Sequence, residues 1–130
     1  MILKSISEQF IRGAEFRQLD QAMETSVPGK VSSIEGIAPS SFPLIAASVF
    51  NRFGGQVIAV AENPQKMQEL YLDLTCFTDP DLIFTLPPWD TLPYEFVSPP
   101  ENIERERITA IYRMIRGLPS LIVTAVESLV

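Results

Sequence analysis

One loop in the sequence has residue types that could bind phosphate, and it lies just before a segment with the spacing of an amphipathic helix. The loop spans residues 35 to 41 and contains Gly36 and the hydroxyl groups of Ser40 and Ser41. Phosphate-binding loops work because backbone N–H groups at a helix N-terminus surround the phosphate oxygens while a lysine neutralises their charge. This loop has no lysine and no second glycine, and Pro39 has no N–H to donate. The sequence therefore favours a strand-to-helix turn, a degenerate phosphate loop that binds no cofactor.

A cluster of carboxylates is a second candidate, because paired acids can act in general acid–base catalysis. It consists of Glu101, Glu104 and Glu106, alternating with Arg105 and Arg107. The acids and arginines have the spacing of pairs within one helix. This pattern favours a solvated, charged helix face, and we predict no catalytic residue.

The sequence contains no histidine and a single cysteine, Cys76. Histidine is the commonest transition-metal ligand and general base, and one thiolate cannot form a zinc site. We therefore expect no metal site. One cysteine also excludes an internal disulfide and suits a reducing compartment, which points to the cytoplasm.

Three aromatic residues lie in the proline-rich stretch from residue 87 to 100: Trp89, Tyr94 and Phe96. A loop with three aromatic side chains must either fold them onto the domain or offer them to a partner. Packing is the favoured interpretation, and a partner-binding surface stays open as the alternative.

The charge of the chain limits its partners. With 16 acidic and 10 basic residues, the formal net charge is −6. Such a field repels nucleic-acid phosphate, so we expect no direct binding of DNA and no base stacking by the aromatic residues. No apolar run approaches the roughly 20 residues that span a bilayer, so we expect no membrane contact.

The elements that would position these residues follow from hydrophobic spacing. Two short helices are predicted between Ser5 and Thr25, and a strand from Val31 to Glu35. A helix follows, with an apolar stripe predicted at Phe42, Ile45, Val49 and Phe53.

The second half of the chain repeats the alternation of strand and helix. Strands are predicted at Gln56–Ala61, Leu82–Leu86 and Ser120–Ala125. Between the first two lies a helix capped by Asn63, with Met67, Leu70, Tyr71 and Leu74 along one face. Before the last strand, a helix from Glu101 to Arg116 is predicted to turn Ile108, Ile111, Tyr112 and Ile115 inward.

Alternating strands and helices specify an α/β fold: a parallel sheet of about four strands with helices on both faces. We predict a helical leader at residues 1–30 and the α/β domain at residues 31–130. The chain stops five residues beyond the last strand, where the pattern ordinarily continues, so we expect the domain to be truncated at its C-terminal end.

Several motifs resemble those of transcription-repair coupling factors. The segment Pro88–Tyr94 reads PWDTLPY, and the pair Ser98-Pro99, Ile103, Arg107 and the segment Leu121–Leu129 follow it. In that family a W-[DE]-T-L-P-Y segment, an S-P pair and an arginine-bearing helix precede a strand of this kind. The resemblance covers roughly residues 31 to 130.

The resemblance implies a degenerate P-loop helicase domain (RecA-like), because the family's N-terminal module is similar to domain 1a of UvrB, the damage-recognition helicase of bacterial nucleotide excision repair. In UvrB the loop that matches residues 35–41 is an intact phosphate loop. UvrB also carries a DNA-clamping hairpin between the third strand and the segment matching Asp90-Thr91, whereas this chain passes from Leu86 to Asp90 in four steps.

The resemblance also implies a non-catalytic scaffold that recruits the repair protein UvrA to a stalled RNA polymerase. UvrA would be bound mainly through a neighbouring downstream domain. Further downstream domains would bind RNA polymerase and DNA and carry the ATP-driven translocase motor.

Two alternatives from other classes stay open at this point. One is a nucleotide-binding α/β enzyme domain that uses the Gly36 turn and the hydroxyls of Ser40 and Ser41 without a lysine. The other is a peptide-binding module that uses Trp89 and the aromatic residues after it.

Overall fold

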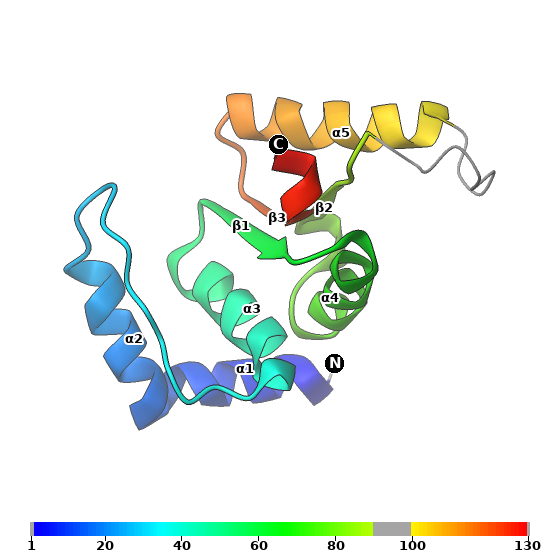
Figure 1. The fold of residues 1–130 in the computed structure, drawn as a ribbon. Coiled ribbons are helices and arrows are strands. Elements are labelled where there is room, and N and C mark those ends of the chain that lie inside the picture. Colours follow the sequence, from blue (N-terminus) through cyan, green and yellow to red (C-terminus); the bar gives the residue numbers. More distant parts are fainter. Residues whose placement is uncertain (1, 90–99, 130) are drawn as a thin grey trace.

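The computed structural model describes residues 2–89 and 100–129, which form a parallel sheet between helices (Figure 1). Its three strands, in the spatial order β1-β3-β2, are β1 (Gln56–Ala61), β2 (Ile83–Leu86) and β3 (Ser120–Ala125). β1 and β2 both pair in parallel with β3, with Ile58 and Phe84 on either side of Ile122. β3 is the central strand, and all six of its residues are buried.

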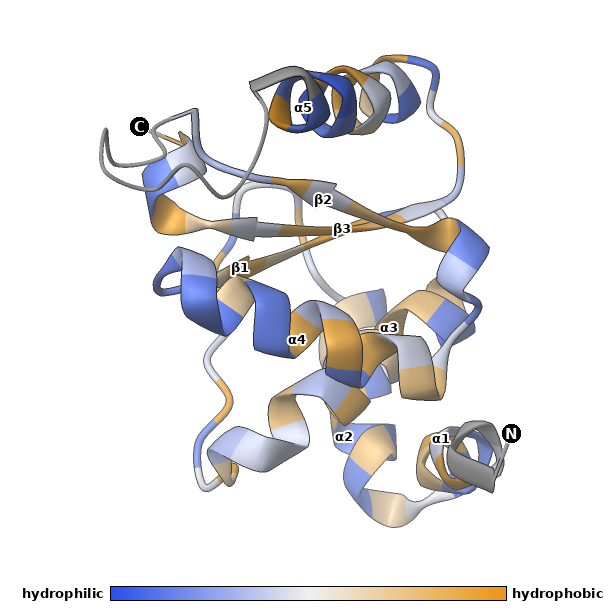
Figure 2. Cartoon of the chain, turned by 90° about the vertical axis from the view of Figure 1, so that its right-hand side faces the viewer, coloured by the Kyte–Doolittle hydropathy of each residue, from blue (hydrophilic) through white to orange (hydrophobic). Residues whose placement is uncertain are grey.

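Helices cover both faces of the sheet. On one face lie α3 (Phe42–Phe53) and α4 (Pro64–Phe77), and on the other lies α5 (Pro100–Ile115). Figure 2 shows the sheet between these two layers. The larger core cluster joins α3 and α4 to the sheet, and a smaller one joins Leu86 and Ile122 to Ala110 of α5. The predicted α/β class with helices on both faces is confirmed.

The sheet has one strand fewer than predicted among the described residues, because Val31–Glu35 forms no strand. Side chains of a strand alternate between its two faces. Val31 and Ile34 therefore fall on opposite faces, each beside polar neighbours, so neither face of the segment is apolar enough to pack on the domain. Both side chains are exposed. The prediction of about four strands was wrong on this segment.

α4 forms as its local signals predict. The side chain of Asn63 accepts a hydrogen bond from the Lys66 N–H at 2.8 Å, and Pro64 occupies the first turn, where its missing N–H costs nothing. The predicted face of α4 is buried at Met67, Leu70 and Leu74 and half-buried at Tyr71.

The apolar stripe predicted for α3 was wrong. Phe42 and Phe53 are exposed, and Ile45 and Val49 are only half-buried. The buried face instead holds the smaller residues Pro43, Ala46 and Ala47 together with Ser48 and Phe50. Alanines let α3 lie close to β1 and α4, and this close approach decides the face that turns inward.

The inward face predicted for α5 was also wrong. Ile108, Ile111, Tyr112 and Ile115 are between 39% and 79% exposed, whereas Ala110 is fully buried. A small residue at the contact lets the helix approach the sheet. Beside it, the Arg113 guanidinium lies 4.6 Å from the centre of the Phe84 ring. The spacing of the apolar residues was correctly recognised, but the stripe points away from the sheet.

The leader forms two helices, α1 (Ile2–Arg12) and α2 (Ala14–Glu24), and α1 packs against α3 and α4 (Figure 1). A buried polar network joins these helices. The Ser7 and Ser48 hydroxyls lie 3.3 Å apart, Asn51 Nδ2 donates to Ser7 Oγ at 3.4 Å, and Thr78 Oγ1 donates to Asn51 Oδ1 at 2.8 Å. The division of the chain at residue 30 stays a prediction.

None of the helices within residues 2–89 and 100–129 combines the length and the apolar character needed to cross a bilayer.

Candidate functional site

The loop predicted as a degenerate phosphate site does not have the geometry of a phosphate-binding loop. Gly36 has a positive φ of 75°, which a side chain would strain, and it lies in a bend of an irregular segment rather than after a strand. A 3-10 turn, Pro39–Ser41, then leads into α3. The Ser41 side chain makes no capping hydrogen bond, and Pro43 removes another N–H from the first turn of α3. This helix N-terminus offers few of the donors that a phosphate needs.

The three predicted loop residues do not converge on one site. Gly36 and Ser41 line a cavity of about 640 Å³ between the leader helices and α3, together with Phe10 and Leu19. Ser40 lines a different cleft, of about 700 Å³, at the carboxyl end of β1. Gly36 and Ser40 therefore do not line one common cavity.

The cleft at the carboxyl end of β1 is where open α/β sheets usually bind their ligands. Its charged lining consists of Glu62, which follows β1, and of Lys66, Glu69 and Asp73 from α4. The single ammonium group lies 3.2 Å from Glu69 Oε2, so it already has a counter-ion. Three carboxylates against one paired lysine repel phosphate rather than attract it.

A corner at the carboxyl end of β2 is built around Arg107. This side chain is only 8% exposed. Its guanidinium donates a hydrogen bond to the Pro87 carbonyl and stacks at 4.7 Å over the ring of Trp89. In the described part of the chain it makes no ion pair. Arg107 therefore positions the chain that leaves β2, and its predicted place on a solvated helix face was wrong.

Trp89 is the one predicted aromatic residue that lies within the described part of the chain. It is 65% exposed although it stacks on Arg107. Packing onto the domain was the favoured interpretation, and for Trp89 the structure instead supports an accessible ring. Tyr94 and Phe96 lie outside the described residues.

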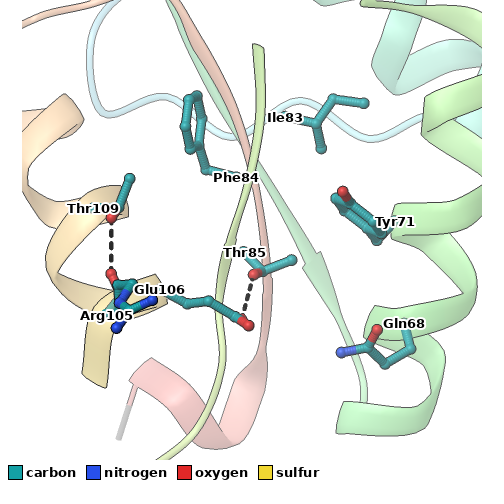
Figure 3. A pocket seen from close by; sticks show the side chains of 8 residues that line it. All are labelled: Gln68, Tyr71, Ile83, Phe84, Thr85, Arg105, Glu106 and Thr109. Atoms are coloured by element: carbon teal, nitrogen blue, oxygen red, sulfur yellow. Dashed lines mark hydrogen bonds between the residues drawn. The ribbon is translucent and has the colours of Figure 1, made fainter. Parts of the chain in front are cut away.

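A groove of about 370 Å³ runs along the outer edge of β2, between α4 and α5 (Figure 3). Tyr71 of α4 and Phe84 of β2 give it an apolar part. The Thr85 hydroxyl donates to Glu106 Oε2 at 2.7 Å, and the Thr109 hydroxyl donates to the Arg105 carbonyl at 2.8 Å. The hydroxyls of Thr85 and Thr109 are therefore already hydrogen-bonded, and Glu106 accepts one of these bonds.

The described residues contain no group of three or more histidine, cysteine or carboxylate side chains placed to hold a metal ion. The acidic residues of the β1 cleft come from the end of β1 and from successive turns of α4.

Sequence reasoning missed two features. The buried role of Arg107 could have been inferred from its spacing, because it lies three residues before Ala110 and four after Ile103 on one helix face. The acidic wall of the β1 cleft had no such signal, since the end of β1 and two turns of α4 meet only once the helix has folded back beside the strand.

Comparison with known proteins supports the resemblance that the motifs carry. The chain is 27% identical, over 85 residues, to the "Transcription-repair-coupling factor" of Escherichia coli (strain K12). The match covers 65% of this chain but 7% of that protein, so the chain spans only a small part of its relative's length. No family model matches. The predicted resemblance to transcription-repair coupling factors is confirmed.

Proposed function

We propose that this chain is a non-catalytic scaffold of a transcription-repair coupling factor, which helps recruit UvrA to a stalled RNA polymerase. The ATP-driven motor and the contacts with RNA polymerase and DNA belong to other domains of such a protein. A partner of RNA polymerase in bacteria works in the cytoplasm, which is where the proposal places the chain.

The observation that carries the proposal is the β1 cleft. A helicase-like domain that used nucleotide would present a lysine and free N–H groups there. This cleft presents Glu62, Glu69 and Asp73 instead, and its Lys66 is paired. Together with the similarity to a repair coupling factor, this favours a domain that has kept the helicase-like architecture for binding proteins.

Nucleotide is expected to leave the stability of the chain unchanged. A ligand at one hundred times its dissociation constant adds about 2.7 kcal/mol to the free energy of unfolding. Because the acidic cleft repels phosphate, millimolar magnesium-ATP or magnesium-ADP should give no saturable change in Tm. Thermal unfolding measured over a nucleotide titration checks this, with magnesium chloride at matched ionic strength as the control.

A saturable rise in Tm would contradict the proposal. It would instead favour the alternative function, a nucleotide-binding enzyme domain with an atypical loop at Gly36. Glu69→Ala, which frees Lys66, would then show whether the β1 cleft is the binding site, because removing that carboxylate should strengthen the rise.

Recruitment is tested with purified UvrA and the immobilised chain, by surface plasmon resonance. The resemblance assigns the principal contact with UvrA to a neighbouring domain, so we expect weak but saturable binding with a Kd of roughly 1 to 100 µM. Absence of binding over that range would remove direct recruitment from the proposal.

The exposed ring of Trp89 favours one alternative, a peptide-binding module. Trp89→Ala separates the two functions when the UvrA measurement is repeated. Unchanged binding would mean that UvrA contacts another surface of the chain. Lost binding would identify the corner around Trp89 as the recognition site.

A further inference from the structure

The groove between α4 and α5 follows an edge of the sheet that has no strand partner among the described residues (Figure 3). Its lining includes Ile83, Phe84 and Thr85, which are consecutive in β2, so their side chains alternate between the two faces. Ile83 packs with the core under α4, and Phe84 packs with the core under α5. One groove can contact all three only where it passes around the strand. Because β3 pairs with the other side of β2, the groove lies along the outer edge.

The main chain of β2 presents hydrogen-bonding groups to this groove. Every second residue of an edge strand points its N–H and C=O away from the sheet, and β2 has four residues. No turn or loop backbone hydrogen bond within residues 2–89 and 100–129 reaches Ile83, Phe84 or Thr85. The Leu86 carbonyl accepts a hydrogen bond from Thr124 Oγ1, which lies on β3, the paired side of the strand. The outer donors and acceptors are therefore available to an added strand.

The Glu106 side chain covers part of this edge. Thr85 shares a face of β2 with Ile83, on the side of α4, whereas Glu106 belongs to α5 on the opposite face. The Thr85 hydroxyl nevertheless donates to Glu106 Oε2 at 2.7 Å, so the Glu106 side chain reaches around the outer edge of β2 (Figure 3). Charged side chains at sheet edges commonly prevent unwanted strand pairing. A single hydrogen bond between exposed groups adds little net stability, so a strand that forms several main-chain hydrogen bonds can displace it.

The walls of the groove suit an extended, mainly apolar segment. An added strand would turn alternate side chains toward α4 and toward α5. On the side of α4 these side chains meet the half-buried ring of Tyr71. The charged side chains in the lining, Arg105 and Glu106, have opposite signs, so the groove does not select for one charge. Recognition would therefore depend on main-chain hydrogen bonds and one apolar contact, as it does where other proteins add a partner's strand to a sheet edge.

We propose that the β2 edge binds an extended segment of a protein partner as an additional strand, once the Glu106–Thr85 hydrogen bond opens. The β2 edge consists of the unpaired side of this strand and the side chains that flank it: Tyr71, Ile83, Phe84, Thr85 and Glu106. A second copy of this chain is the poorer occupant, because edge-to-edge pairing would bring together two Glu106 carboxylates and two chains of net charge −6. The inference rests on the scaffold part of the proposed function and adds the surface and the conformation of the partner.

The test uses a labelled peptide roughly twice as long as β2, with alternating valine and threonine and a lysine at each end for solubility. Fluorescence anisotropy of this peptide, titrated with the full chain, should show saturable binding. Glu106→Ala and Thr85→Val should each strengthen binding by about fivefold, because each removes the hydrogen bond that the peptide must displace. The double variant should bind no more tightly than either single variant, since both substitutions open the same contact.

Glu104→Ala is the matched control, since Glu104 is an exposed glutamate of α5 that lines a different hollow. It should change the Kd by less than about twofold, because exposed charges away from the contact are screened. A peptide with N-methylated central amides should lose binding, because it cannot donate main-chain hydrogen bonds to β2. Amide hydrogen exchange should show added protection at residues 83–85 when the unmethylated peptide is bound. Circular dichroism verifies that each variant is folded.

Several results would overturn the inference. They are the absence of binding by both the wild type and Glu106→Ala up to about 1 mM peptide, equal binding of the N-methylated peptide, and an equal gain with Glu104→Ala. Sedimentation equilibrium adds another, because a dimer formed by Glu106→Ala and not by Glu104→Ala would identify a second copy as the occupant. The nucleotide titration does not depend on any of these results, so failure of the β2 edge leaves the non-catalytic assignment intact.

Discussion

Leu74→Ala is expected to lower the free energy of unfolding by about 2 to 5 kcal/mol, while Leu72→Ala changes it by less than about 0.5 kcal/mol. The two leucines lie two residues apart in α4, yet Leu74 is 0% exposed and Leu72 is 62% exposed. Leu74 belongs to the core cluster that α3, α4 and β3 share. Alanine there leaves a cavity that the close-packed alanines of α3 cannot fill.

Urea unfolding followed by circular dichroism measures both variants. Because both substitutions replace leucine by alanine in the same helix, helix propensity cancels and burial accounts for the difference. Equal midpoints for the two variants would contradict the orientation of α4. A domain of this size has about 5 to 15 kcal/mol of stability, so a loss of this magnitude should shift the urea midpoint clearly.

α4 shows how far local sequence signals reach. Its start depends on Asn63 and Pro64, whose capping role does not require the rest of the fold, and its inward face was predicted correctly. β1 and β3 were predicted equally well, because a short run of apolar residues between turns is typical of a buried strand.

For α5, local sequence signals did not predict which face is buried. Its apolar stripe is visible in the sequence, but only the packed sheet shows that Ala110 turns inward and that Ile111 stays exposed. An apolar stripe indicates which face of a helix is apolar, but not which surface that face contacts. Val31–Glu35 is a similar case. Its residues suggested a strand, but among the described residues this segment pairs with no other strand.

The absence of a nucleotide site at the Gly36 loop stays a prediction, and two kinds of observation favour it. The missing lysine and the N–H lost at Pro39 are visible in the sequence. The structure adds a second reason, since α4 brings Glu69 and Asp73 to the wall of the cleft that Ser40 lines. Restoring a lysine to the loop would therefore not restore phosphate binding, because the acids of α4 would remain.

Phe16→Ala is expected to cost about 3 to 5 kcal/mol of stability, provided that the leader helices unfold together with the sheet. Phe16 of α2 is 1% exposed, and its ring meets that of Phe10 edge to face at a centroid distance of 5.5 Å. Phe53→Ala is the control, since Phe53 is a phenylalanine at the end of α3 that is 37% exposed. It should cost about 1 kcal/mol or less.

The shape of the Phe16→Ala unfolding curve decides the division of the chain at residue 30. Buried hydroxyls of Ser7 and Ser48 join α1 to α3, and Arg52 of α3 lies 3.5 Å from Asp20 and 3.6 Å from Glu24 of α2. These contacts predict a single transition in which circular dichroism and Trp89 fluorescence change together. If helix content is lost first while Trp89 fluorescence stays native, the leader is an independent unit whose loss leaves the sheet intact, and the cost of Phe16→Ala belongs to the leader alone.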